Sequence, residues 1–244
     1  MRSNIVSALA LSAFVVASPA AAQEGVKGQF SVSFKGGIAQ PISGDVHLGG
    51  SGRVLGLPTN VQARTYDDVY DLGYGFGAGL GYGLSRNVEV FGDFTWGKAE
   101  ASDLSVGNVA GLDLRAQFAD YKTYGFEGGL RFHLAPESTI APYLSVVGGF
   151  KSIDAIPATF SVPAAGVTLS NTPFYDESTV PLFGGDFGLL INTNSRLAFG
   201  IEAGLRYHGE LDGLEGLAGT GLESLNDTGN RWSFPVVGTV KMRF

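Results

Sequence analysis

The chain contains no cysteine among its 244 residues. This excludes a fold held by disulfide bonds, which many small exported domains use. Beyond its N-terminal segment it also has no apolar run of 18 or more residues, so we expect no membrane-spanning helix in the mature chain. Basic residues are few, with 16 Lys and Arg against 23 Asp and Glu. This acidic balance argues against nucleic acid as a partner.

A phosphate-binding loop is missing too, although glycine is abundant, with 37 residues. The stretch LGYGFGAGLGYGL, residues 72–84, has glycine at every second position. No register of this run gives the G-x-G-x-x-G fingerprint of a dinucleotide site. Its period of two is that of a β-strand. We expect its six glycines to face the inside of a barrel and to leave room there for bulky side chains such as Arg131, Tyr143 and Arg206.

The first 22 residues have the pattern of a secretory signal peptide. Arg2 precedes an uncharged apolar run from Ile5 to Ala17, and three alanines follow at residues 20–22. We expect cleavage after residue 22, so that residues 23–244 form the mature protein as one β domain. Loss of Arg2 changes the net charge from −7 to −8. An uncleaved anchor helix is the alternative.

Eight segments alternate between apolar residues and polar residues or glycine, which predicts eight β-strands. Each is about ten residues long and would cover roughly 23 Å when tilted, close to the height of the apolar band of a transmembrane barrel. The expected strands are residues 30–38, 72–84, 88–96, 124–134, 143–151, 182–191, 197–208 and 232–244.

The connections between these segments alternate in length, which is typical of outer-membrane barrels. The predicted fold is an all-β, eight-stranded antiparallel up-and-down transmembrane β-barrel with short periplasmic turns and four long extracellular loops. The turns are residues 85–87, 136–138 and 192–195, and the loops are residues 41–70, 100–120, 154–178 and 210–230. We expect the second and third loops to extend as hairpins. Because Pro235 cannot donate a hydrogen bond within the last strand, we also expect a β-bulge there.

Tracing the strands up and down places aromatic residues at two heights on the outer face, where membrane interfaces favour them. Phe132, Tyr82 and Phe244 fall at the short-turn end. A soluble barrel such as a lipocalin, with apolar residues inside, is the alternative. The aromatic residues expected at the membrane interface of the long-loop end are Trp96, Tyr124, Tyr207 and Trp232.

The signal peptide, the eight strands, the alternating loops and the terminal VVGTVKMRF together resemble the small outer-membrane β-barrel family, which includes the OmpA barrel and opacity-type surface proteins. Phe244, with Met242 and Val240 at alternate positions before it, is similar to the C-terminal sorting signal that this family presents to the barrel-insertion machinery. The resemblance implies the outer membrane of a Gram-negative cell, in contact with lipid and lipopolysaccharide. We expect no peptidoglycan-binding domain and no role as a cell-wall tether.

Charged residues on the polar strand faces are expected to line the lumen. An eight-stranded barrel is narrow, and buried charges are tolerated only when they are paired, so a packed ionic core is predicted. A narrow path for small solutes is the alternative. We expect Arg131 and Arg206 to pair with Glu127 and Glu202. The full predicted network is Lys35, Glu89, Asp93, Glu127, Arg131, Asp186, Glu202, Arg206 and Lys241.

The three histidines, His47, His133 and His208, lie far apart, and no two share a strand or a helical spacing. No catalytic, cofactor or metal site is therefore predicted. We expect a structural or surface-interaction role, in envelope integrity, adhesion or host contact. A narrow pore is the alternative, and a lipid-modifying enzyme ranks third. The acidic fourth loop is expected to be a solvated surface, or to contact divalent cations near lipopolysaccharide or a surface partner. Its acidic residues are Glu210, Asp212, Glu215, Glu223 and Asp227.

Overall fold

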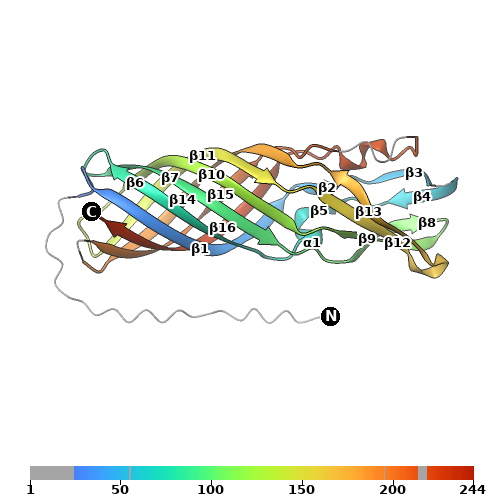
Figure 1. Ribbon diagram of the computed structural model, residues 1–244, viewed down its shortest axis with the longest axis horizontal. Coiled ribbons are helices and arrows are strands. Elements are labelled where there is room, and N and C mark those ends of the chain that lie inside the picture. Colours follow the sequence, from blue (N-terminus) through green and yellow to red (C-terminus); the bar gives the residue numbers. More distant parts are fainter. Residues whose placement is uncertain (1–24, 55, 195, 214–218) are drawn as a thin grey trace.

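The structure is a computed structural model that describes residues 25–54, 56–194, 196–213 and 219–244. The predicted signal peptide, residues 1–22, and Glu215 lie outside the described residues. Figure 1 shows a long β-barrel, with the C-terminus at the short-turn end and the long connections gathered at the opposite end, on the right of the view. None of the helices in the described residues is long and apolar enough to cross a bilayer.

Eight strands close into an antiparallel barrel in which neighbours in space are neighbours in chain order. The predicted eight-stranded up-and-down fold is confirmed. Several strands are longer than expected because they continue beyond the apolar alternation. The barrel strands are β1 (Phe30–Ser43), β6 (Gly73–Gly83), β7 (Val88–Ala99), β10 (Tyr121–His133), β11 (Ile140–Ile153), β14 (Ser178–Asn192), β15 (Leu197–His208) and β16 (Arg231–Arg243).

The barrel closes through β1, which pairs with β16 on one side and with β6 on the other. Phe34, for example, lies opposite both Val240 and Ala78. At the short-turn rim, Phe30 and Phe244 exchange two backbone hydrogen bonds of 2.8 and 3.4 Å. Each of the eight described barrel strands therefore has a partner on both sides, as a lipid surrounding requires.

Large apolar side chains cover the outer face of the barrel and stay about half exposed. Phe76 is 63% exposed, whereas Glu89 on the adjacent strand points inward and is 3% exposed. A soluble protein rarely exposes a contiguous apolar patch of more than roughly a few hundred Å². A belt around the whole barrel therefore requires lipid, and the alternative of a soluble barrel with an apolar interior is wrong. Each strand contributes to the belt, through Phe34, Phe76, Phe94, Phe126, Phe150, Phe183, Ile201 and Val240.

Four aromatic residues lie on the outer face near the long-loop end, in two cross-strand pairs. Trp96 of β7 lies opposite Tyr124 of β10, and Tyr207 of β15 lies opposite Trp232 of β16. The rings of Tyr207 and Trp232 pack edge to face with centroids 5.5 Å apart. This is the height at which amphipathic rings meet the headgroup region.

The glycine-rich strand β6 turns its glycines toward the lumen and its large residues toward lipid. A Cβ atom at Gly79 would overlap the carboxylate of Asp93, and one at Gly81 would overlap the carboxylate of Glu89. The glycines at these two positions therefore make room for acidic side chains of the neighbouring strand β7. We had expected them to accommodate bulky groups from across the barrel.

Pro235 lies in β16 without the β-bulge that we expected. Opposite β1 it pairs with Ala39, and the register shift in this pairing lies further on, between Pro41 and Ser43. Opposite β15, pairing stops between Ala203 and Arg206 and resumes in the same register. The missing N–H is thus accommodated by a gap in one ladder and not by an inserted residue.

The long connections, expected as separate loops and hairpins, form one folded unit that we call the cap: the described residues of 44–72, 100–120, 154–177 and 209–230. Three hairpins, one from each of the first three loops, form a six-stranded sheet in the order β13-β12-β9-β8-β4-β3. Thr59 pairs with Val109 and Ala158 pairs with Phe118, so strands of different loops hydrogen-bond to one another. The cap strands are β3 (Gly50–Val54), β4 (Leu57–Val61), β8 (Leu104–Val109), β9 (Leu112–Phe118), β12 (Ile156–Val162) and β13 (Val167–Tyr175).

The cap also contains several short elements. The strands β2 (Asp45–His47) and β5 (Arg64–Thr65) pair with each other, and α1 (Tyr66–Val69) follows β5. Two short 3₁₀ turns, η1 (Pro163–Ala165) and η2 (Glu223–Asn226), lie in the third and fourth loops.

The cap has a hydrophobic core of its own. Val106, Ala116, Ile156 and Phe174 are all 2% exposed or less. The first three loops each contribute residues to this core, as the sheet topology requires. The fourth loop adds Leu211, Leu222 and Leu225.

The fourth loop also joins the two edges of the cap sheet. Tyr175 of β13 forms a β-bridge with Gly213, and the backbone N–H of Arg53 in β3 donates to Thr220 O at 2.7 Å. The fourth loop is therefore packed onto the cap through its apolar residues. Its described acidic residues, Glu210, Asp212, Glu223 and Asp227, are exposed, as the expectation of a solvated acidic surface requires.

The fit of β6 against β7 predicts that adding one methyl group will be costly. Gly79→Ala should lower the free energy of unfolding by about 1–3 kcal/mol, because the methyl group displaces the buried Asp93 carboxylate. Urea titration of the protein in lipid vesicles, followed by unheated gel mobility, measures this. Gly238→Ala is the matched control, since the nearest atom to its new methyl group is Gly36 O at 3.6 Å. Equal stability of the two variants would contradict the packing described here.

Candidate functional site

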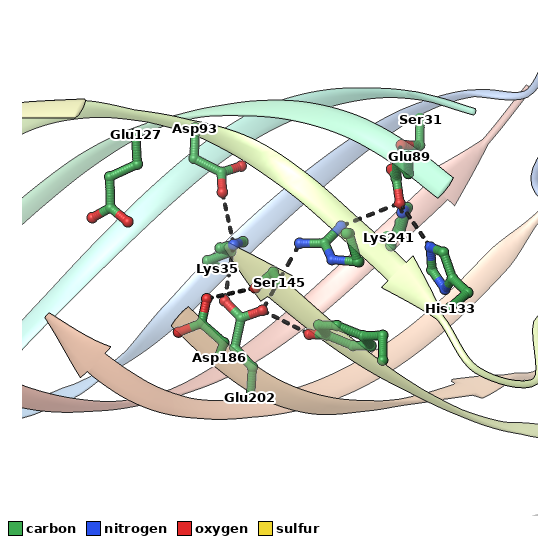
Figure 2. Close-up of polar contacts among 12 residues, drawn as sticks. Ser31, Lys35, Glu89, Asp93, Glu127, His133, Ser145, Asp186, Glu202 and Lys241 are labelled. Carbon is green, nitrogen blue, oxygen red and sulfur yellow. Dashed lines mark hydrogen bonds and ion pairs between the residues drawn. The ribbon is translucent and has the colours of Figure 1, made fainter. Parts of the chain in front are cut away.

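The lumen contains three clusters of charged side chains. The cluster nearest the short-turn end is centred on Glu89 of β7 (Figure 2). Lys241 of β16 lies 2.5 Å from both carboxylate oxygens, and Arg131 of β10 lies 3.3 Å from Oε2. Ser31 of β1 donates to Oε1 at 2.9 Å, and His133 Nε2 lies 3.0 Å from Oε2. One buried carboxylate therefore links β7 to three other strands.

The second cluster is centred on Lys35 of β1. Its ammonium group lies 2.7 Å from Asp93 Oδ2 and 2.9 Å from Glu202 Oε1. Tyr143 of β11 donates to the other oxygen of Glu202 at 2.6 Å. Arg131 lies 3.9 Å from that same oxygen and so connects the first cluster to the second.

The third cluster is centred on Arg206 of β15. Its two terminal nitrogens lie 2.6 and 3.1 Å from the two oxygens of Asp186, which is the bidentate geometry that arginine favours. Its Nε donates to Glu127 at 3.1 Å. Ser145 also donates to Asp186, at 2.7 Å.

The structure brings together all nine charged residues that the sequence assigns to the lumen. Arg206 pairs with Glu127, whereas Arg131 lies closer to Glu89 than to Glu202. The predicted network contained only charged residues and so left out the neutral donors, although Tyr143 was expected inside the barrel. These donors lie on the same strand faces as the charged residues, so the same alternation could have identified them: Ser31, Tyr143 and Ser145.

Every lumen carboxylate in the described residues has a cationic partner within 4.0 Å. Removing charges from water is costly, and such groups persist inside a protein only when attraction and hydrogen bonds compensate for that cost. The three clusters therefore fill the section of the lumen nearest the short turns with paired charges, and Arg131 connects the first cluster to the second.

Between the third cluster and the cap lies a cavity of about 190 Å³. Glu127 and Arg206 line it toward the clusters, and Tyr66 and Tyr121 line it toward the cap. The guanidinium group of Arg231 donates to the hydroxyls of these tyrosines at 3.3 and 2.8 Å, respectively. The sequence analysis missed Arg231, because it placed the start of the last strand one residue later.

A catalytic arrangement is incomplete in the part of the chain that the structure describes. His208 Nε2 lies 2.9 Å from Ser233 Oγ, a distance that suits a nucleophile and its base. His208 Nδ1, however, has no hydrogen-bond partner there, so no acidic group orients the ring. The described residues also contain no group of His, Asp and Glu that could hold a metal ion.

The outer end of the cap carries an apolar rim, which we define as Leu57, Leu112, Val167 and Leu169. These side chains are 49%, 41%, 44% and 47% exposed. They lie at the ends of three hairpins whose strands are neighbours in the cap sheet. The β8–β9 hairpin turns through Ala110 and Gly111, both with positive φ, as a tight two-residue turn requires.

His47 is buried in the cap. Its ring packs against Phe118 with centroids 6.0 Å apart, and its Nδ1 lies 3.1 Å from Leu48 O. Burial lowers the pKa of His47, and the nearby positive charge of Arg64 acts in the same direction. The contact with Leu48 raises the pKa, but by less than burial lowers it. The folded cap therefore favours the neutral imidazole.

These features define the chain as a transmembrane β-barrel of eight strands, with an ion-paired lumen and a folded extracellular cap. No protein-family model and no curated protein matches the sequence. Among solved structures, the chain is similar to the outer membrane protein OprG from Pseudomonas aeruginosa. That match has 14% identity and a TM-score of 0.51, over 91% of this chain and 99% of that chain.

Two further structures are similar over most of their length. Neisserial surface protein A (NspA) matches at 14% identity with a TM-score of 0.46, over 89% of this chain and 100% of that chain. The outer membrane protease OmpT from Escherichia coli matches at 7% identity with a TM-score of 0.39, over 88% and 97% of the two chains. The chain thus has the fold of the small outer-membrane barrels that its sequence resembles, and its apolar belt suits that membrane. The absence of enzymatic activity stays a prediction.

The central position of Glu89 predicts strong coupling with its cations. Glu89→Gln should lower the free energy of unfolding by about 3–5 kcal/mol, because Lys241 and Arg131 then lack their shared carboxylate. The double variant Glu89→Gln/Lys241→Met should lose less than Glu89→Gln alone, since one uncompensated cation is gone. Urea unfolding in lipid vesicles of the parent, Glu89→Gln, Lys241→Met and the double variant measures these effects. A double variant that loses the sum of the two single effects would contradict the coupling.

The lowered pKa of His47 predicts that the cap opens more readily in acid. Below about pH 6.5 the opened cap takes up a proton that the folded cap excludes, so stability falls with pH until the folded group also titrates. Amide hydrogen exchange at pH 7.5 and 5.5 gives the opening free energies of residues 44–70. His47→Phe, which keeps an aromatic ring beside Phe118, should remove most of the difference. If the variant keeps the full pH dependence, another group is responsible.

Proposed function

We propose that the chain is a surface-exposed outer-membrane protein that uses its cap to bind a partner outside the cell, in adhesion or host contact. The observation that carries this proposal is the apolar rim, Leu57, Leu112, Val167 and Leu169, each more than 40% exposed at the outer end of the cap. Exposed apolar patches on a protein surface mark interaction sites, and these four residues lie near the turns of hairpins that share one sheet.

The packed hairpins and core beneath the rim favour binding. A loop that orders itself only on binding loses conformational entropy, and this weakens affinity. Here the hairpins pair with one another and pack over a common core that includes Val106 and Phe174. A rim held in place before contact avoids most of that cost.

Three further partners belong to this proposal. Lipid and lipopolysaccharide would contact the apolar belt and its aromatic ends. The barrel-insertion machinery would read the C-terminal residues Val240, Met242 and Phe244, which point outward and are 38%, 38% and 73% exposed. A role in envelope integrity would rest on the barrel and these contacts, and a role in attachment would rest on the cap.

The pore alternative has weaker support. Charged clusters fill the lumen toward the short-turn end, where Glu89 and Lys241 are 3% and 2% exposed. At the other end lies the cap (Figure 1), which has a hydrophobic core of its own. A solute would have to displace both.

Replacing apolar residues of the rim with serine tests whether the rim binds a partner. Leu57→Ser, Leu112→Ser and Leu169→Ser, combined in one protein, should reduce attachment of producing cells to host cells or matrix proteins by about tenfold or more. Cells that lack the protein and are complemented with each variant provide the measurement. Thr168→Ala, an exposed polar change in the same hairpin, is the matched control and should leave attachment unchanged.

Sensitivity of the same cells to detergents and bile salts separates the two roles. Normal resistance with lost attachment supports binding through the rim. Normal attachment of the triple variant, at equal surface amount, overturns the proposal. Lost resistance in cells without the protein, together with unaltered attachment, supports envelope integrity instead.

A further inference from the structure

The cavity beneath the cap differs from the clusters below it in how its charges are paired. In the clusters, the described cations have carboxylate partners. Two of the cations that line the cavity, Lys151 of β11 and Arg231 of β16, have none in the described residues. The ammonium group of Lys151 makes no hydrogen bond there either, and Arg231 is only 4% exposed. Lys151 is partly exposed, whereas Arg231 is buried. A buried cation without an anion is costly, so this region favours an anion that the chain does not provide.

Unpartnered polar atoms also gather at this cavity. Arg231 Nε, His208 Nδ1 and Thr95 Oγ1 are buried and have no hydrogen-bond partner in the described residues, and all three residues line the cavity. Most buried polar atoms in proteins are hydrogen-bonded, so a group of unpaired ones needs an explanation. Lys151, Arg231 and Arg206 all place positive charge near His208.

The nearby carboxylates are already shared. Glu127 faces the cavity and lies near Lys151, but its Oε2 accepts a hydrogen bond from Arg206 at 3.1 Å. Asp93 and Glu202 also line the cavity and both pair with Lys35. The remaining contacts of Arg231 are with the neutral oxygens of Tyr66, Tyr121 and Gly209. None of these groups neutralises Lys151 and Arg231 together.

The rest of the cavity wall suits an apolar body. Gly73, Gly75 and Gly77 of β6 present bare backbone, and the rings of Tyr66 and Tyr70 lie toward the cap. An apolar cavity of about 150 Å³ is enough to hold benzene. A cavity of about 190 Å³ therefore admits a compact molecule of that size with a polar substituent.

We propose that this cavity is a binding site for a small organic carboxylate. The carboxylate would contact Lys151, Arg231 and His208, and the apolar part would lie along the glycine face of β6. The site is distinct from the rim on the cap, and neither proposal depends on the other.

Binding of 4-fluorobenzoate to the protein in nanodiscs, followed by fluorine NMR, tests the site. The parent protein should show saturable binding of 4-fluorobenzoate and much weaker binding of the neutral analogue 4-fluorobenzyl alcohol. Lys151→Met should weaken binding of the carboxylate by about tenfold, the equivalent of one charge-assisted hydrogen bond. Lys151→Arg, which keeps the charge, should retain binding.

The matched control is Lys122→Met, which removes the same charge from an exposed position of β10 outside the cavity. It should leave binding unchanged. Since Lys151 has no partner to lose, Lys151→Met should fold, which unheated gel mobility checks. If it does not, the comparison of carboxylate and alcohol on the parent protein decides the matter. Equal binding of these two probes, no saturable binding, or equal loss in Lys122→Met would overturn the proposal.

Discussion

Closure of eight strands in lipid is the constraint on which the rest of the structure depends. Lipid offers no hydrogen bonds, so β1 must meet both β6 and β16, and the strand count then limits the width of the lumen. Alternation sends every second side chain into this narrow space, where a charge is tolerated only beside its opposite. The glycines of β6 follow from the same limit: Gly79 and Gly81 leave the space that Asp93 and Glu89 occupy. Strand propensity is lost there, and ion pairing across the lumen is gained.

The cap is shaped by the burial of its apolar side chains and by the need to pair its buried backbone groups. Loops of this length above a membrane could remain solvated, but these contain Val106, Ile156 and Phe174, which gain stability only if they are buried. Pairing hairpins from different loops buries them and satisfies the backbone of each strand at once. The fourth loop then joins the edges of the sheet through Gly213 and Thr220. The cap is thus a second core placed on top of the barrel.

The barrel could be predicted from the sequence because its signal is local. A period of two over ten or more residues fixes which side chains face lipid, and this identified both Phe76 on the outer face and Glu127 in the lumen. The partner of each charge could not be predicted in full, because it depends on the relative height of strands around the barrel. Arg131 reaches Glu89 on the adjacent strand more closely than Glu202 across the lumen. The cap was missed for a related reason: strands of five to nine residues, such as β3 and β13, alternate too briefly, and their pairing joins different loops.

The distribution of charge along the lumen separates a stabilising section from an open one. Where a carboxylate meets two cations, as Glu89 does, replacing either side leaves a buried charge, so these positions tolerate little change. Toward the cap the balance shifts, because Arg231 relies on tyrosine hydroxyls and Lys151 has no anion in the described residues. Stability alone would favour a neutral or paired residue at both positions. Cations without an anion, beside a cavity and three unpaired polar atoms, are better explained by an anion from outside the chain than by folding.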